Sequence, residues 1–330
     1  MGNKSGNQRV VKLKRNKKKK RQKQSATTFQ GIIHLLTSKK SNDFRRFQHL
    51  YGMRMINTMS GEEAWLHQDT TMFQVQELQA KSGEVNGEWK FELRIRYLPL
   101  EWTEVYEADN LTFMSYYNQI LTDYLSKNFE SLDQEIAFNL GCLEIRRLFK
   151  DMLQNALEKK SNIEYLEKEV GLSKFLPKII LDSVKPKTIR KLIQQHFKKY
   201  AHFTERDCMF KFLDLLKGLY RYDQERFRCT TGSWSIPVTL VIGPSQGISY
   251  TTDSTATATH MTEFSHIQSI QTLESGVNAK GLLQLRVAGS AELLTVTCPT
   301  LREAENIADL VDGYCRQVNN SPTSIWIRKG

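Results

Sequence analysis

The fold is decided near the C-terminal end of the chain, where residues 293–318 read LLTVTCPTLREAENIADLVDGYCRQV. Residues 293–298 form a short alternating run, which predicts a strand. From Thr300 the apolar period becomes helical, and Thr300 with Glu303 predicts a capping box. The Asn-Asn-Ser-Pro sequence at 319–322 is typical of the end of a helix. We therefore expect one amphipathic helix, whose apolar stripe comprises Leu301, Ala304, Ile307, Ala308, Val311, Tyr314, Cys315 and Val318.

Short alternating runs precede this helix, separated by Gly-Pro, Ser-Thr and Gly-Ser turn signals. They predict strands at residues 234–242, 247–251, 264–272, 282–288 and 293–298. Exposed Ser and Thr at residues 251–262 predict a flexible loop. An antiparallel meander closed by a single C-terminal helix is the shape of a PH or PTB module. Modules of the PTB kind add a peptide strand in the groove between the last helix and an edge strand, although the sequence identifies no such peptide.

Upstream of this module the apolar period is helical from about residue 103 to 222. It predicts helices at residues 111–127, 133–157, 163–170, 186–200 and 205–220, which together form a helical bundle. Residues 27–100 predict a small α+β unit. Its clearest elements are a helix at 29–36 and a strand at 91–97, whose perfect alternation predicts one core face and one solvent face.

The positive charge of the chain is concentrated at its N-terminal end. The whole sequence has a formal net charge of +11, and residues 1–23 hold eleven Lys and Arg and no acid. The remaining 36 basic residues balance the 36 acidic residues, so the body is neutral. This argues against a body that coats nucleic acid by bulk charge, and no specific nucleic acid is expected as a partner.

Several functional classes are excluded. No apolar run approaches the roughly 18–20 residues of a membrane span, and no apolar segment follows the basic start as a secretory signal requires. Five widely spaced cysteines predict reduced thiols in an intracellular protein. Kinase, P-loop and zinc-protease motifs do not occur, so we expect no catalysis and no cofactor. His196 lies in an apolar stripe and is expected to be a packed, hydrogen-bonded histidine.

Six runs of sequence carry a resemblance to a known family. They are residues 89–99 (WKFELRIRYLP), 143–147 (LEIRR), 155–162 (NALEKKSN), 181–185 (LDSVK), 247–250 (GISY) and 308–316 (ADLVDGYCR). Together they closely resemble the FERM region of the focal adhesion kinase family, over about residues 52–328.

The resemblance implies an α+β multidomain protein with three lobes. We call these the first lobe (27–102, ubiquitin-like α+β), the second lobe (103–222, acyl-CoA-binding-protein-like helical bundle) and the third lobe (223–320, PH/PTB-like β-sandwich with a C-terminal helix). A basic, mostly disordered tail (1–26) precedes them, and a linker starts at 321–330.

Two departures from the family pattern bear on this expectation. Residues 9–13 (RVVKL) resemble the family's first strand, but a Lys/Arg run stands where the first hairpin should continue. This predicts an incomplete or marginally stable first lobe. In the family a linker with an autophosphorylated tyrosine and a kinase domain would follow Gly330.

The segment from Lys185 to Lys198 predicts an anion site. At helical spacing its apolar residues share one face and its basic residues the opposite one. A solvated helix back is the ordinary interpretation, but no acid occurs between residues 183 and 204. The helix N-terminus adds partial positive charge. The resemblance implies that this patch binds phosphoinositide-rich membrane through Lys185, Lys187, Arg190 and Lys191, with Lys159 and Lys160.

The resemblance also implies a kinase-docking surface on the second lobe. The matching residues are Phe149, Met152, Asn162, Tyr165 and Leu166, of which Phe149 and Tyr165 differ in kind from the usual family residues. Ordinary bundle core is an equally good interpretation for Phe149, Met152 and Leu166.

Three interpretations of the basic tail stay open: a solvated extension, a membrane-attracting segment and a nuclear-import signal formed by Lys17, Lys18, Lys19, Lys20 and Arg21. The first six residues depart from the N-myristoylation pattern at Gly6.

We therefore expect a non-catalytic FERM scaffold and regulatory module in integrin and adhesion signalling. Its expected partners are phosphoinositide membrane, a tyrosine kinase domain in cis or in trans, and receptor tails or adhesion proteins. It is expected to be cytoplasmic and peripheral at the plasma membrane or focal adhesions. The alternatives are the N-terminal part of an active focal adhesion tyrosine kinase and a nuclear adaptor.

Overall fold

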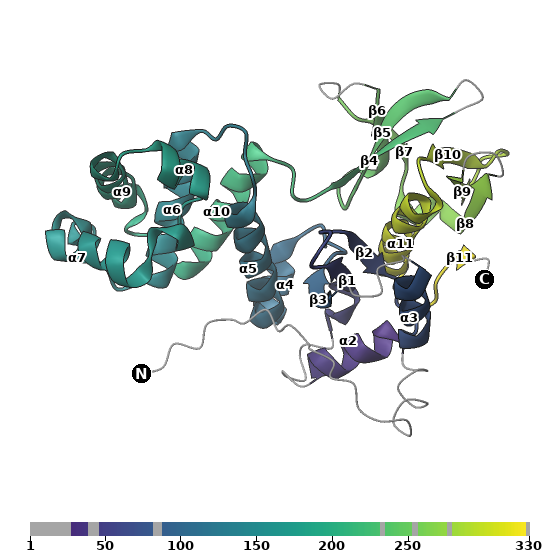
Figure 1. Cartoon of the computed structure of the whole chain (residues 1–330), viewed down its shortest axis with the longest axis horizontal. Helices are drawn as coiled ribbons and strands as arrows, with labels where there is room; N and C mark the ends of the chain where they lie inside the picture. The colour runs from purple at the N-terminus through teal and green to yellow at the C-terminus, as the bar shows by residue number, and fades with distance from the viewer. Residues whose placement is uncertain are drawn as a thin grey trace. The chain divides into compact units, whose positions relative to one another are not determined.

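A computed structural model describes residues 28–38, 46–81, 88–231, 235–252, 257–275 and 279–327. The chain divides into two compact units (Figure 1): unit 1 combines residues 1–115 with 223–330, and unit 2 is 116–222. The basic tail and the strand expected at 9–13 lie outside the described residues. Among the helices of the described ranges, none is long and apolar enough to cross a membrane.

The first lobe, in unit 1, is built on a three-stranded antiparallel sheet. β1 (Tyr51–Asn57) is central and pairs with β2 (Glu63–Leu66) and β3 (Trp89–Ile95). The helix expected at 29–36 is present as α2 (Phe29–Ser38), and its buried Phe29 and Ile33 belong to the core. Further helical segments follow as η2 (Gln48–Leu50), α3 (Met72–Lys81) and α4 (Trp102–Ala108).

The solvent face predicted for the strand at 91–97 is wrong at two positions. Arg94 and Arg96 are only 8% and 5% exposed. Arg96 is covered because it reaches the third lobe, where its guanidinium pairs with Asp309 and donates to the Asn306 side-chain oxygen at 2.8 Å. Alternation alone identifies two faces, and a second domain can bury the polar one.

The third lobe, also in unit 1, contains an eight-stranded sheet in the order β11-β8-β9-β10-β4-β5-β6-β7. Neighbouring strands are antiparallel except β11 and β8, which are parallel. The strands are β4 (Glu225–Thr231), β5 (Ile236–Gly243), β6 (Gly247–Thr251), β7 (Thr259–Thr262), β8 (Ile267–Ser275), β9 (Lys280–Val287), β10 (Leu294–Cys298) and β11 (Trp326–Ile327). The helix α11 (Leu301–Val318) lies along β8–β10 (Figure 1). Thr300 caps it by accepting from the Glu303 N–H, so the predicted strand and helix are confirmed.

Local sequence missed or misplaced three features of this sheet. β4 has only two apolar residues in seven, and it is a strand because β5 and β10 pair with its two edges. The loop expected at 251–262 is wrong for Thr259–Thr262, which pairs with β6 as β7. The strand expected at 264–272 starts at Ile267, because Phe264–His266 forms the 3-10 turn η6.

Unit 2 has helices for all of its regular structure, and the first of them, α5, begins at Asn110 within unit 1. These are α5 (Asn110–Ser126), α6 (Gln134–Leu148), α7 (Lys160–Tyr165), α8 (Lys178–Ser183), α9 (Pro186–Tyr200) and α10 (Glu205–Leu219), with the short segments η3 (Ala156–Glu158), η4 (Leu166–Val170) and η5 (Leu172–Lys174). α6 packs against both α9 and α10. The helix expected at 133–157 ends at Leu148, because the Arg146 guanidinium donates to the carbonyls of Met152 and Phe203 and holds the chain in a turn.

Candidate functional site

α9 presents one buried and one basic face. Pro186 occupies its first turn, where a missing N–H breaks no helical hydrogen bond. The buried side chains follow the predicted stripe and are Ile189, Ile193, His196, Phe197 and Tyr200. Lys185, Lys187 and Lys191 are exposed. The helix therefore has the expected polarity.

Acidic residues from other segments reach this basic face. Glu167 of η4 receives two hydrogen bonds from Arg190, each 2.7 Å long. Glu158 of η3 pairs with Lys198 at 2.5 Å. A stretch without acids at 183–204 therefore does not produce a surface without acids, because the fold brings carboxylates from preceding turns. The pairing leaves little of the Arg190 charge for a ligand.

Most of the predicted anion-site lysines remain outside such pairs. Within the described ranges, those without an acidic partner within 4 Å are Lys159, Lys185, Lys187 and Lys191. Lys160 pairs with Glu164 at 3.6 Å, but its side chain is 82% exposed. An ion pair so exposed holds the lysine only weakly.

The end of α6, the turn that follows it and the last residue of α7 form a partly exposed apolar surface. The rings of Phe149 and Tyr165 meet edge to face, with centroids 6.5 Å apart. Tyr165 is 52% exposed, while Phe149 and Met152 are half-buried. Leu148 and Leu153, which the sequence did not single out, are 45% and 73% exposed. We call Leu148, Phe149, Met152, Leu153 and Tyr165 the α6–α7 apolar surface.

Two residues expected on this surface have structural roles. Leu166 is 0% exposed and belongs to the core of unit 2, in line with its alternative interpretation. Asn162 is half-buried, and its amide donates to the Ala156 carbonyl at 2.8 Å, which ties α7 to η3. A partner could therefore reach Phe149 and Tyr165 more directly than Leu166.

His196 is one of the buried side chains of α9. Its Nδ1 lies 2.7 Å from the Asn139 side-chain oxygen, as expected of a packed histidine. Burial, followed by the charge of Lys199, lowers the pKa of His196, so the ring is neutral at pH 7. Within the same residues, no three His, Cys, Asp or Glu side chains are placed to hold a metal.

The first and third lobes of unit 1 share buried polar contacts. Arg96 stacks on Trp65, with 4.5 Å from its guanidinium carbon to the ring centre, and pairs with Asp309 of α11. Tyr97 belongs to the third-lobe core. Gly313 permits this, because a Cβ at residue 313 would overlap the Tyr97 ring.

Asp312 of α11 is the centre of a second buried cluster. Its Oδ2 lies 3.4 Å from Nε2 of His67 and accepts from Arg316 at 2.9 Å. Its Oδ1 accepts from the Ser324 hydroxyl at 3.0 Å and from the Ile325 N–H at 2.8 Å. The Asp69 N–H donates to the other ring nitrogen of His67, Nδ1, so Nε2 carries the proton that points to Asp312. One carboxylate thus binds the first lobe, α11 and the residues before β11.

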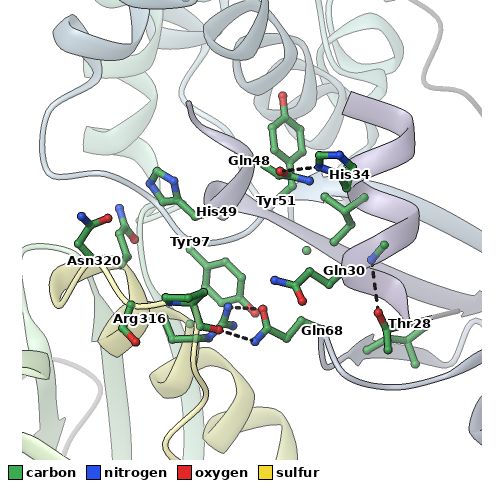
Figure 2. Close-up of a pocket in the computed structure, with 18 residues that line it drawn as sticks. Thr28, Gln30, His34, Gln48, His49, Tyr51, Gln68, Tyr97, Arg316 and Asn320 are labelled. Carbon is green, nitrogen blue, oxygen red and sulfur yellow. Dashed lines mark hydrogen bonds between the residues drawn. The ribbon is translucent and has the colours of Figure 1, made fainter. Parts of the chain in front are cut away.

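A cavity of about 590 Å³ opens beside this cluster (Figure 2). Its wall combines polar and apolar side chains, and the Nδ1 of His34 lies 3.4 Å from the Gln48 side-chain oxygen. Arg316 donates to the Gln68 side-chain oxygen at 2.5 Å as well as to Asp312. The carboxylate of Asp312 therefore already balances the charge of Arg316. Burial is the largest influence on His49 and lowers the pKa of this ring. Nothing in the sequence pointed to this cavity, since its wall combines separate stretches of the chain at 28–34, 48–52, 66–68, 97 and 313–322.

Three protein-family models match the chain in order. The FERM N-terminal domain matches residues 8–99, the FERM central domain residues 104–227, and the FAK1/PYK2 FERM domain C-lobe residues 229–325. A curated relative described as the inactive tyrosine-protein kinase kin-32 of Caenorhabditis elegans is 26% identical over 316 residues. The match covers 92% of this chain and 36% of the relative, so the chain spans about a third of that protein.

Solved structures agree on the fold. The FERM and C-terminal domain complex of Drosophila Merlin has a TM-score of 0.62 at 15% identity, covering 90% of this chain and 92% of that one. The MyTH4-FERM MF2 domain of Dictyostelium discoideum myosin VII has a TM-score of 0.62 at 16% identity, covering 88% and 55%. The chain belongs to the FERM family, with the three FERM lobes in order and a C-lobe of the FAK1/PYK2 type.

Proposed function

We propose that this chain is a non-catalytic scaffold and regulatory module of the focal adhesion kinase type whose second lobe binds phosphoinositide-containing membrane. The observation that carries the proposal is the set of exposed lysines, Lys185, Lys187 and Lys191, that have no acidic partner within the described residues. Such lysines keep their full charge for lipid phosphates. FERM domains bind membranes and protein partners in general, which supports this assignment.

Sedimentation with phosphoinositide vesicles tests the proposal. Each lysine near an anionic surface contributes about 1 kcal/mol, so changing all three to Glu should weaken binding by roughly 100-fold or more. Every sample carries Gln at Lys17, Lys18, Lys19, Lys20 and Arg21, because the tail itself attracts anionic lipid. Unchanged sedimentation of the triple variant would contradict the proposal.

The matched control reverses two lysines of the same helix that already have acidic partners. Lys198 pairs with Glu158, and Lys199 lies 3.3 Å from Glu135. Lys198→Glu with Lys199→Glu should weaken vesicle binding less per charge than the reversal of Lys187 and Lys191. Equal losses would mean that net charge, and not the start of α9, governs binding.

We propose, as a second function, that the α6–α7 apolar surface docks a tyrosine kinase domain and restrains it. The supporting observation is the Phe149–Tyr165 ring pair with Tyr165 half exposed, beside exposed Leu148 and Leu153. Exposed aromatic and aliphatic side chains in one place are typical of a protein interface. The kin-32 relative is described as an inactive tyrosine-protein kinase and is longer than the region matched here. The contact would act in cis if a kinase domain follows this chain, and otherwise in trans.

Titration calorimetry with a separate kinase domain of the focal adhesion type tests the docking proposal. Tyr165→Ala removes an exposed ring, so it should weaken binding at least tenfold and leave the helical circular dichroism unchanged. Phe73→Ala is the control, because Phe73 is also about half exposed (54%) but lies on α3 of unit 1. Absence of heat with the unchanged chain would reject the proposal.

Location and partners follow from the same assignment. We propose that the protein acts in the cytoplasm, peripheral at the plasma membrane or focal adhesions, with receptor tails or adhesion proteins as partners. Imaging the chain with and without residues 1–24 tests this against the nuclear-adaptor alternative. Nuclear signal that depends on the tail would favour the adaptor, and membrane signal lost with the α9 reversals would favour the scaffold.

A further inference from the structure

We propose that Cys229 of β4 and Cys298 of β10 are a dithiol that a hydroperoxide converts to a disulfide, and that this disulfide clamps the two halves of the third-lobe sheet together. All five cysteines of the chain are free thiols in the structure. The proposal concerns the third lobe only, so it does not depend on the membrane or kinase contacts of the second lobe. Its failure would leave the proposed function untouched.

The strand register places the two cysteines opposite each other. β10 and β4 pair in the antiparallel direction, with Val296 opposite Thr231 and the next residue of β10 opposite Thr230. The following position in the same register sets Cys298 opposite Cys229. Opposite residues of an antiparallel pair have Cα atoms about 4.5–5.5 Å apart, within the range of about 4.4–6.8 Å that a disulfide spans. The backbone can therefore accept the bond without rearrangement of the strands.

The two sulfur atoms are already in contact. Sγ of Cys229 lies 3.7 Å from Sγ of Cys298. Both side chains belong to the third-lobe core, where they are 6% and 1% exposed. A disulfide requires the sulfur atoms to approach to about 2 Å, which small rotations about the Cα–Cβ bonds can provide. The bond therefore needs an adjustment of two side chains and no new contact between distant segments.

The bond would form where the pairing between strands is short. In the described sheet, the β4–β10 ladder connects the strands β11-β8-β9-β10 with the strands β4-β5-β6-β7. Among the residues that the structure describes, this ladder has register pairs at Thr230 and Thr231 alone, whereas β4 pairs with β5 from Glu225 to Thr231. A link between Cys229 and Cys298 would extend the short ladder. Because these residues are 69 positions apart along the chain, the link would also restrict the unfolded chain and thereby stabilise the fold.

The oxidation is a two-electron reaction in two steps. One thiol, as its thiolate, attacks the hydroperoxide and becomes a sulfenic acid, and the leaving oxygen takes up the proton as water or, from an organic hydroperoxide, as an alcohol. The second thiol then attacks the sulfenic sulfur, the S–S bond forms, and the hydroxyl group leaves with the thiol proton as water. The two sulfur atoms lose two electrons in total, and the peroxide O–O bond gains them and breaks.

Formation of the clamp should follow transient opening of the β4–β10 ladder. The hydrogen bond with Cys298, followed by burial, raises the pKa of the Cys229 thiol, so the thiolate that attacks a peroxide is scarce while the sheet is closed. Local opening exposes a thiol to solvent and oxidant. Closing then returns the oxidised sulfur to its partner, where the second step completes the bond. We therefore expect slow formation that partial loosening of the sheet accelerates.

Mass spectrometry of the full chain after treatment with hydrogen peroxide tests the proposal. Alkylation of the denatured protein should fall from five thiols to three, and proteolysis without reductant should yield a peptide that links Cys229 to Cys298. The oxidised chain should unfold at a temperature at least about 5 °C higher, and dithiothreitol should reverse this shift. Urea at concentrations below the unfolding transition should speed the reaction.

Cys315→Ala is the matched control, because Cys315 is buried in the same core but its thiol donates to the Phe264 carbonyl at 3.4 Å. This variant should still form the linked peptide, and Cys298→Ala should lose both the peptide and the reversible shift in unfolding temperature. Where Cys298→Ala fails to fold, as judged by circular dichroism, the identity of the linked peptide in the unchanged chain decides. Five thiols that persist in peroxide, links between random pairs of cysteines, sulfinic acid without a link, or a linked chain with an unchanged unfolding temperature would overturn the proposal.

Discussion

Arg96 is an arginine whose charge is almost wholly removed from solvent, since its side chain is 1% exposed. Changing its partner Asp309 to Ala leaves the buried guanidinium with the partly exposed Glu225, 3.5 Å away, as its acidic partner, which should cost about 3 kcal/mol of unfolding free energy. Urea denaturation followed by tryptophan fluorescence measures this in unit 1, because all five tryptophans lie there.

The control for this prediction is an exposed ion pair in the same unit. Arg46 and Glu104 are 2.7 Å apart but 62% and 68% exposed, so Glu104→Ala should cost under about 1 kcal/mol. Arg96→Met with Asp309→Leu should recover much of the Asp309→Ala loss, because the buried Nε of Arg96 and Oδ1 of Asp309 lack hydrogen-bond partners. Similar costs for Asp309→Ala and Glu104→Ala would contradict the burial argument.

Asp312 should make the stability of unit 1 sensitive to acid. Burial alone raises the pKa of its carboxyl, but the hydrogen bond from His67 and the charge of Arg316 outweigh it, and the pKa falls below its usual 3.8. A carboxyl with a depressed folded pKa stabilises above its unfolded pKa, and that contribution is lost as the pH falls through the folded value. Between about pH 5 and 3, Asp312→Asn should therefore lose stability less steeply than the unchanged chain. Glu104→Gln is the exposed control and should keep the original slope.

Two glycines in helices of unit 2 should respond to Ala in opposite ways. A Cβ on Gly141 of α6 would lie 2.9 Å from the Leu176 side chain and 3.0 Å from the Phe175 carbonyl, both buried, so Gly141→Ala should cost roughly 1–3 kcal/mol. A Cβ on Gly218 of α10 meets nothing within 4 Å, so Gly218→Ala should stabilise by up to about 1 kcal/mol. Thermal unfolding followed by far-ultraviolet circular dichroism measures both. Two changes of the same sign would contradict the packing of α6 on residues 175–176.

At the scale of elements, sequence predicts what local periodicity controls. α9 spans Pro186–Tyr200 as predicted, because the helix-starting proline and the apolar stripe are both local signals. The early end of α6 was not predictable, since it depends on Arg146 bonding the distant Phe203 carbonyl. β4 was not predicted for a similar reason, because it is a strand through its pairing with β5 and β10.

In the candidate site too, the features set by local sequence were predictable and those set by distant contacts were not. The basic face of α9 was visible in sequence, but Glu167, which neutralises Arg190, lies 23 residues away along the chain. The ring pair of Phe149 and Tyr165 joins two positions that resemblance selected, whereas burial of Leu166 needed the packed bundle. Sequence suggested a groove that adds a strand in the third lobe, and only the sheet order reveals that β11 occupies the β8 edge.

At the scale of the whole molecule, unit 1 is discontinuous in sequence, because residues 1–115 and 223–330 belong to it and unit 2 is inserted between them. The third-lobe core includes Tyr97 from the first lobe. Asp309 and Asp312, both buried, bind Arg96 and His67 of the first lobe. The core of the third lobe therefore includes a first-lobe side chain, and two of its buried carboxylates have their partners in the first lobe, more than 200 positions earlier in the sequence.

This dependence predicts which fragments fold. Residues 223–330 alone would lack the Tyr97 ring and leave two carboxylates without their first-lobe partners, so they should lose cooperative unfolding or melt well below the complete chain. Residues 109–222 keep α5 whole, with Asp109 accepting from the Leu111 N–H, and should fold alone as a helical bundle. Circular dichroism melts of both fragments, with tryptophan emission for 223–330, measure the outcome. If 223–330 alone unfolded cooperatively at the temperature of the complete chain, the lobe contact would contribute little, and the burial of Arg96 and His67 would have another cause.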